Sequence, residues 1–350
     1  MSAAGTGRTS IGALVMQRWR GIDPLLPDPG PLPQGCGAVF TMAGAAGAPA
    51  AAATCEHSAA APGSLHTARG TARRFQLVPQ ITGPDVGGTL DRLLGQWRDH
   101  LAGLPGTDSQ DTAAVVDWPS RDIEGVAALV HHGFAPLAVL AARVTGGHPS
   151  GPADRAAPAG GSRGEGDTGG ATGQAGVRIR RAGPADIDVV VRLGLEVIRY
   201  DAHFGNGGER PDTARALRRE ADEMLAGPQP WMWLAERDGA AIGLLAAQRP
   251  ELAGWIAPLV GASPVAYLML MFVAPGERAG GIGGEMVARL HADIRAAGVP
   301  VTLLHYEQVN PLSAPFWSQQ GYRPLWTDWE ARPAVALHQP RRRADVGGQC

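Results

Sequence analysis

Residues 271–285 of the chain read Met-Phe-Val-Ala-Pro-Gly-Glu-Arg-Ala-Gly-Gly-Ile-Gly-Gly-Glu. Their apolar beginning completes the run Val265–Val273, which predicts a fully buried strand. The glycines that follow allow the backbone to turn so that successive N–H groups face one point. The amphipathic pattern over Glu285–Ala297 predicts a helix, whose N-terminus adds a partial positive charge. This order of elements predicts an anion site that fits a pyrophosphate.

Two common kinds of phosphate loop do not match this stretch. A P-loop needs a lysine followed by serine or threonine, and all the basic residues of this chain are arginines. A Rossmann turn needs a different spacing of its glycines and an acidic residue after the next strand. The loop therefore belongs to another class of anion site.

The order of Arg278, Gly281 and Gly283 after Val273 and Pro275 resembles the coenzyme A loop of the GCN5-related N-acetyltransferase (GNAT) family. The later sequence resembles the strand–helix segment that follows this loop in the family, with matches at Asn310, Ala314, Pro315, Phe316, Trp317, Gly321 and Tyr322. The resemblance covers about residues 177–333. It implies an α/β (α+β) fold with a mixed, mostly antiparallel central sheet flanked by helices.

The resemblance also implies direct transfer of an acetyl group from acetyl-CoA, the co-substrate, to a primary amine. The backbone of residues 271–273 would pair with the pantetheine arm, and the loop would hold the pyrophosphate. The implied cofactor-binding residues are Met271, Phe272, Val273, Arg278, Ala279, Gly280, Gly281, Ile282, Gly283, Gly284 and Asn310. Asn310 has a second interpretation, as the cap of the helix that follows it.

The catalytic groups are less clearly indicated. A general base must take a proton from an ammonium group, and the end of the strand after the loop offers His305 and Glu307, with His203 as a further candidate. The family usually has a tyrosine at the position of Trp317, where it protonates the leaving thiolate. Candidates for the replacement acid are Tyr306, Ser313, Ser318 or a water molecule.

The N-terminal half carries related segments. Residues 115–118 align with 303–306, and residues 133–137 align with 321–325, so that a Gly–aromatic pair and a proline coincide. This agreement predicts a duplicated domain. The position of the coenzyme A loop is occupied in the N-terminal copy by residues 83–88, which include no arginine. They do include Asp85, whose negative charge would repel a pyrophosphate. We expect this copy not to bind the cofactor.

Composition predicts the boundaries of the domains. Residues 1–145 form a degenerate GNAT-like domain with a disordered, Ala- and Gly-rich insert at about 43–70, and 146–176 form a flexible, Gly-rich linker. Residues 177–335 form the N-acetyltransferase domain, and 336–350 form a disordered tail. In the C-terminal domain, the periodicity further predicts helices over 185–200, 212–225 and 312–320, and strands over 177–181, 231–236, 240–247 and 301–306.

Charge and cysteine content exclude several partners. The 350 residues carry a formal net charge of −2, without a basic field for nucleic acid or an anionic membrane. The uncharged stretch Leu252–Pro275 is interrupted by Pro258, Gly261 and Pro264, which favours a loop and a buried strand over a membrane span. Three cysteines without ligand spacing predict no metal site and a cytoplasmic location.

The remaining expectation concerns the partner. The acceptor is a small-molecule or peptide amine, and the sequence indicates neither its identity nor the oligomeric state. The alternative is a non-catalytic acyl-CoA-binding or regulatory protein, because Trp317 replaces the usual acid and the buried strand carries no carboxylate.

Overall fold

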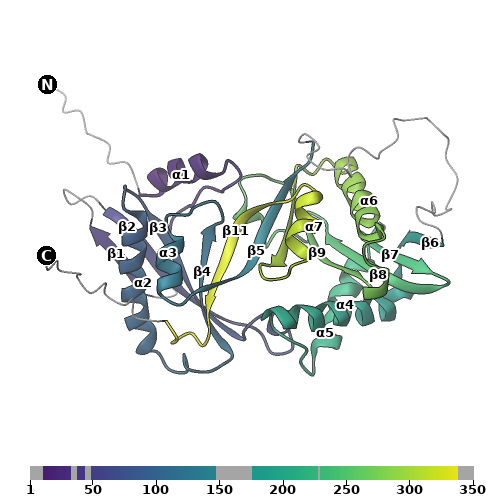
Figure 1. The fold of residues 1–350 in the computed structure, drawn as a ribbon, viewed down its shortest axis with the longest axis horizontal. Coiled ribbons are helices and arrows are strands. Elements are labelled where there is room, and N and C mark those ends of the chain that lie inside the picture. Colours follow the sequence, from purple (N-terminus) through teal and green to yellow (C-terminus); the bar gives the residue numbers. More distant parts are fainter. Residues whose placement is uncertain (1–10, 33–37, 44–48, 147–175, 228, 338–350) are drawn as a thin grey trace, which may run out of the picture.

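The computed structural model describes residues 11–32, 38–43, 49–146, 176–227 and 229–337 (Figure 1). Most of the expected linker and tail therefore lies outside the described residues. Leu337, at the start of the expected tail, is buried in the core of the N-terminal half.

Helices and strands alternate along both halves of the chain. The helices are α1 (Ile11–Ile22), α2 (Val86–Ala102), α3 (Val126–His131), α4 (Ile187–Asp201), α5 (Thr213–Leu225), α6 (Ile282–Ala296) and α7 (Ser313–Gln319). The strands are β1 (Val39–Ala43), β2 (Pro49–Ala59), β3 (Arg73–Ile81), β4 (Thr112–Pro119), β5 (Ala135–Val144), β6 (Val177–Arg181), β7 (Met232–Arg237), β8 (Ala240–Gln248), β9 (Val265–Val273), β10 (Val301–Glu307) and β11 (Arg323–Ala331).

All these strands join in one sheet. Its order is β1-β2-β3-β4-β11-β5-β10-β9-β8-β7-β6, with β1 and β6 at opposite ends of the molecule in Figure 1. Only the pairs β3–β4 and β9–β10 are parallel, and the other pairs are antiparallel. The expected mixed, mostly antiparallel sheet is confirmed.

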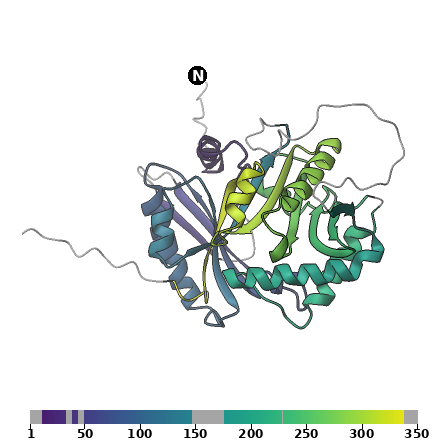
Figure 2. The same cartoon turned by 45° about the vertical axis from the view of Figure 1, so that its right-hand side comes forward.

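The two halves repeat one arrangement and exchange their last strands. The order β3-α2-β4-α3-β5 in the N-terminal half recurs as β9-α6-β10-α7-β11, which confirms that the fold is present twice. However, β11 lies between β4 and β5, whereas β5 lies between β11 and β10. Figure 2 shows yellow β11 among the blue strands of the N-terminal half. Each half thus completes the sheet of the other.

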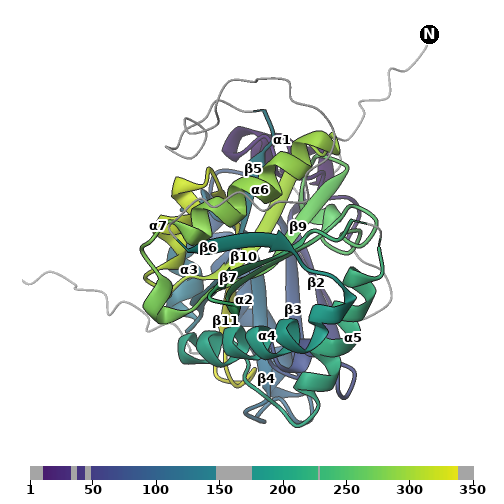
Figure 3. The same ribbon diagram turned by 90° about the vertical axis from the view of Figure 1, so that its right-hand side faces the viewer.

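Helices cover both faces of the sheet. Residues on α6 share a core with one face of β9, β10 and β5, whereas α4 and α5 pack against the opposite face of β7, β8 and β9. Figure 3 shows α6 and α4 on opposite sides of the C-terminal strands. In the N-terminal half, α2 and α3 cover the same face of the sheet as α6 does in the C-terminal half. Helix α1 contacts β2 and β3.

Part of the segment that composition marks as disordered is strand β2. Ala51, Ala53 and Cys55 alternate toward the core and are 0–4% exposed. Their small side chains let α2 approach closely, and the indole Nε1 of Trp97 lies 3.2 Å from the Cys55 sulfur. The composition argument fails here because alanines bury little area themselves but make room for large neighbours.

The structure refines the other expectations. Strand β9 has the predicted bounds, whereas α6 begins at Ile282, three residues before the predicted start, because Gly283 and Gly284 belong to its first turn. Within the described part of the chain, no helix is long and apolar enough to cross a bilayer.

Candidate functional site

A cavity of about 690 Å³ opens where the two parallel C-terminal strands separate. Strands β9 and β10 pair only from Val265 to Leu268 and from Val301 to Leu304. Beyond this point β9 remains paired with β8 and β10 with β5, so their inner edges diverge and line the cavity. The divergence leaves backbone N–H and C=O groups available to a ligand.

The glycine-rich loop forms one wall of this cavity. Its backbone turns through the left-handed region at Ala279 (φ 63°) and at Gly281 (φ 86°), which is the N-cap of α6. The loop is held in place by Arg278, whose Nε donates to the Val273 carbonyl over 3.0 Å and whose guanidinium carbon lies 4.9 Å from the centre of the Tyr200 ring. This geometry presents the N-terminus of α6 to the cavity.

The two glycines in the first turn of α6 serve different purposes. A Cβ on Gly283 would approach Met271 Cε to 2.5 Å, so this glycine allows the helix to lie against β9. A Cβ on Gly284 would have Gln320 Nε2 as its nearest neighbour, at 4.0 Å. Gly284 therefore keeps the cavity wall open beside the N-terminus of α6.

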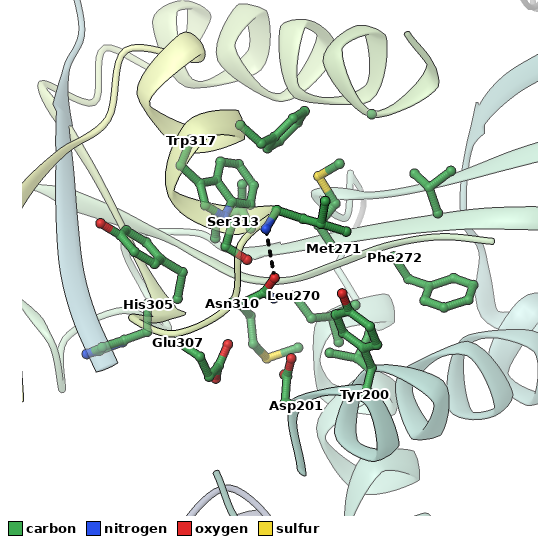
Figure 4. A pocket seen from close by; sticks show the side chains of 18 of the residues that line it. Tyr200, Asp201, Leu270, Met271, Phe272, His305, Glu307, Asn310, Ser313 and Trp317 are labelled. Atoms are coloured by element: carbon green, nitrogen blue, oxygen red, sulfur yellow. Dashed lines mark hydrogen bonds between the residues drawn. The ribbon is translucent and has the colours of Figure 1, made fainter. Parts of the chain in front are cut away.

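Most of the predicted cofactor residues line the cavity. They are Met271, Phe272, Val273, Arg278, Ala279, Gly281, Ile282, Gly283, Gly284 and Asn310, whereas Gly280 is not part of its wall. The Oδ1 of Asn310 accepts a hydrogen bond from the backbone N–H of Leu312 over 3.1 Å (Figure 4). Asn310 thus forms the turn that leads into α7.

The three predicted catalytic residues lie at the end of β10 and all line the cavity. The Nδ1 of His305 is 3.0 Å from the Tyr267 hydroxyl, and desolvation by the surrounding protein lowers the pKa of His305 to about 4, although part of the ring is exposed to solvent. Burial raises the pKa of the Tyr306 phenol above its ordinary value. Glu307 is 8% exposed, and its Oε1 accepts a hydrogen bond from Asn206 Nδ2 over 2.8 Å. At neutral pH, His305 and Tyr306 are therefore uncharged.

The sequence reasoning did not single out Asp201, at the end of α4. Its pKa is raised to about 8, first by burial and then by the charge of Glu307. Figure 4 shows the carboxylates of Asp201 and Glu307 pointing into the same part of the cavity, whereas the ring of His305 is directed away from them. His203, the predicted neighbour on this side, is exposed and does not line the cavity.

Helix α7 carries Trp317, at the position of the usual acid, and two of the predicted replacement acids, Ser313 and Ser318. Trp317 is 8% exposed and packs edge-on against Phe316 and Tyr322, with ring centres 4.8 and 5.5 Å away. Ser313 lines the cavity, whereas Ser318 does not. Figure 4 also shows the hydroxyl of Tyr200, on α4, pointing into the cavity.

The N-terminal half supplies part of the wall. Ala68 and Arg69 line the cavity, and Leu65 and Ala68 share a small core with Ile198 and Leu217 of α4 and α5. The Ala68 carbonyl accepts a hydrogen bond from the backbone N–H of Gly208 over 2.8 Å. The cavity is consequently built by both halves of the chain.

The corresponding loop of the N-terminal half has another structure. Asp85 is the N-cap of α2, and its side chain accepts a hydrogen bond from the backbone N–H of Gly88 over 3.0 Å. The carboxylate thus lies where a phosphate would bind at the N-terminus of a helix. Among the residues that the structure describes, no group of three His, Cys, Asp or Glu side chains is placed to hold a metal ion.

Comparison with known proteins gives a family match for this region. Residues 198–322 match the model described as the acetyltransferase (GNAT) family. No curated protein sequence matches the chain.

Several solved structures are similar to the chain. A GCN5-related N-acetyltransferase from Sphaerobacter thermophilus has 13% identity and a TM-score of 0.51 over 89% of this chain and 86% of its own. A tandem GNAT protein from the clavulanic acid biosynthesis pathway has 13% identity and a TM-score of 0.38 over 92% of this chain and 95% of its own. A predicted acetyltransferase from Clostridium acetobutylicum, solved with acetyl-CoA, has 21% identity and a TM-score of 0.32 over 42% of this chain and 90% of its own. At 13% identity and a TM-score of 0.51, the match to the Sphaerobacter thermophilus protein shows that the two chains share a fold.

Proposed function

We propose that the protein is an N-acetyltransferase that transfers an acetyl group directly from acetyl-CoA to a primary amine, because residues 198–322 match the acetyltransferase (GNAT) family model. The observation that carries the proposal is the continuous cavity that joins the N-terminus of α6 to the carboxylates of Asp201 and Glu307. One end suits the phosphates of a coenzyme, and the other suits an ammonium group.

The donor would lie along the inner edge of β9. The N–H groups of the glycine-rich loop would hold the pyrophosphate, and the backbone of residues 271–273 would pair with the pantetheine arm. A backbone N–H at this edge would stabilise negative charge on the carbonyl oxygen during the reaction.

Glu307 is the proposed general base. It takes a proton from the acceptor ammonium, and the free amine attacks the acetyl carbon. The C–S bond then breaks to release the coenzyme A thiolate, and the amide nitrogen loses its second proton to solvent. Asn206 fixes the Glu307 carboxylate by its 2.8 Å hydrogen bond. His305 is a weaker candidate because its ring faces away from Glu307 and contacts Tyr267.

The thiolate then takes a proton to form coenzyme A. Tyr306 is the proposed donor because it lines the cavity at the end of β10 and is uncharged. Tyr200 on α4 also lines the cavity, as does Tyr267 on β9, but the Tyr267 hydroxyl contacts His305. The rates of Tyr306→Phe and Tyr200→Phe variants would distinguish the two.

The test is coenzyme A release in the presence of a panel of primary amines, with mass spectrometry of the acetylated product. We expect Glu307→Gln to lower kcat/KM by about 10²–10⁴-fold, the usual contribution of a general base. The matched control is Glu223→Gln, on the exposed face of α5, which should leave kcat/KM unchanged. Equal rates for the Glu307→Gln variant and the wild type would exclude Glu307 as the base.

A second function is favoured by one observation. Trp317 lies in the aromatic core of α7 where an acid is usual, and an indole cannot supply the proton. A non-catalytic acyl-CoA-binding protein would bind acetyl-CoA without forming an acetylated product from any amine in the panel.

A further inference from the structure

The acceptor end of the cavity is the part around the carboxylates of Asp201 and Glu307. It is lined by α4, by Leu217 of α5, by Ala68 and Arg69 of the N-terminal half, and by Asp201, Asn206 and Glu307. Figure 4 places Asp201 and Glu307 on the side of the cavity away from Trp317. Whatever binds there meets two carboxylates and an apolar surface.

The two carboxylates point into the same part of the cavity, so they meet the same charged group of an acceptor. The pKa of Asp201 is raised to about 8, first by burial and then by the charge of Glu307, so Asp201 favours its neutral form at pH 7. One ammonium group neutralises this pair, and a second would lack a counter-charge.

The other charged side chains around the cavity already have partners. Arg69 forms an ion pair with Glu220 at 3.0 Å, and Glu277 pairs with Arg237. Arg278 donates a hydrogen bond to the Val273 carbonyl, and its guanidinium group lies against the Tyr200 ring. Within the described residues, Arg69 and Glu277 are thus paired with opposite charges, and the guanidinium charge of Arg278 lies beside the glycine-rich loop, at the donor end of the cavity.

The remaining surface favours apolar atoms. Apolar side chains line the cavity here, and burial of apolar area against them stabilises a complex; they are Ala68, Val197, Ile198, Leu217 and Leu270. The volume of about 690 Å³ must also hold the arm of the donor, which leaves room for a small acceptor.

We propose, on the basis of the proposed function, that the acceptor is a small primary amine with one positive charge and an apolar body. Polyamines, amino acids with a free carboxylate and peptides are the substrates that these walls disfavour. The N-terminal half acts in recognition, because Ala68 and Arg69 form part of the acceptor wall.

The first test compares kcat/KM for 2-phenylethylamine and hexylamine with kcat/KM for spermidine, glutamate and a lysine-containing tetrapeptide. We expect the apolar monoamines to exceed the other acceptors at least tenfold. A preference for spermidine, glutamate or the peptide would overturn the inference but leave the proposed transferase activity intact.

The second test changes the preference between monoamine and diamine acceptors by a substitution in the cavity wall. Val197 is partly exposed and lines the cavity, so Val197→Asp adds a second negative charge to the apolar wall. We expect the ratio of kcat/KM for 1,6-diaminohexane to that for hexylamine to rise at least tenfold. The control is Val189→Asp, the same substitution on α4 at a partly buried position outside the cavity wall. An unchanged ratio in a folded Val197→Asp protein would contradict the inference.

A binding measurement separates this inference from the transferase activity. Hexylamine and spermidine are titrated calorimetrically into the full-length protein saturated with coenzyme A. Tighter binding of hexylamine, weakened at least tenfold by Glu307→Gln, supports the inference even if no amine is acetylated, in which case the proposed function alone fails. Binding of neither amine, or tighter binding of spermidine, overturns the inference.

Discussion

His305 illustrates how a single side chain differs from its sequence-based role. The residue lies near the end of β10 as predicted, but its Nδ1 faces the Tyr267 hydroxyl at 3.0 Å, and desolvation by the surrounding protein lowers its pKa to about 4. A histidine that is neutral throughout the physiological range gives no pH–rate transition near pH 6.5. Any such transition in acetyl transfer would therefore come from another group.

The lowered pKa of His305 predicts a change in stability with pH. Between about pH 4 and 6.5 the unfolded chain binds a proton at this position and the folded chain does not, so stability falls as the pH is lowered through this range. His305→Gln removes this contribution, and we expect its Tm to depend less on pH between 4.5 and 6.5 than that of the wild type. Scanning calorimetry measures this slope, with His203→Gln, at a position outside the cavity wall, as control. Identical slopes for His305→Gln and the wild type would refute the argument.

The residues of the glycine-rich loop could be predicted because their spacing is local. Asp201, Asn206 and Arg69 could not, since each lies far in sequence from Glu307 and reaches the cavity only through the packing of α4, α5 and the N-terminal segment. A carboxylate at the end of an amphipathic helix is ordinary at the level of sequence. Asp201 is recognised as a site residue only from its burial beside the carboxylate of Glu307.

At the scale of elements, periodicity gave most of the C-terminal helices and strands to within a few residues. It failed where small residues dominate, as in β2 and at the start of α6. Alanine and glycine carry little hydrophobic signal, but they allow a neighbouring helix or strand to approach.

Strand β2 provides a test of this explanation. Ala53 is fully buried against the α2 core, so Ala53→Leu must displace its neighbours, and we expect it to destabilise the fold by about 1–3 kcal/mol. Ala52 points to the opposite face and is partly exposed, which makes Ala52→Leu the matched control. The measurement is urea unfolding of both variants. A similar small effect for the two would show that β2 does not pack closely on α2.

At the scale of the whole molecule, the duplication was visible in the sequence, but the exchange of strands was not. Aligned segments predict two similar units, yet nothing local determines whether β11 pairs within its own half or with β4. The exchange makes the halves mutually dependent, because β10 and β11 each need β5 as a neighbour.

This dependence predicts the behaviour of separated halves. Residues 161–350 expressed alone lack β4 and β5, so β10 loses the partner on one edge and β11 loses the partners on both edges, and we expect an aggregated product. Co-expressed with residues 1–160, the same piece should form a soluble complex with one copy of each, measured by light scattering after gel filtration. A stable, soluble monomer of 161–350 alone would contradict the described exchange.

The account as a whole depends on acetyl-CoA binding at the glycine-rich loop, and calorimetric titration of acetyl-CoA into the full-length protein tests it most directly. Gly284→Glu places a negative charge in the open wall without a steric clash, whereas Gly276→Glu places it on the exposed part of the loop outside the cavity. We predict one equivalent bound by the wild type and by Gly276→Glu, with at least tenfold weaker binding by Gly284→Glu. Absence of binding to the folded wild type, or equal binding by both variants, would contradict the account.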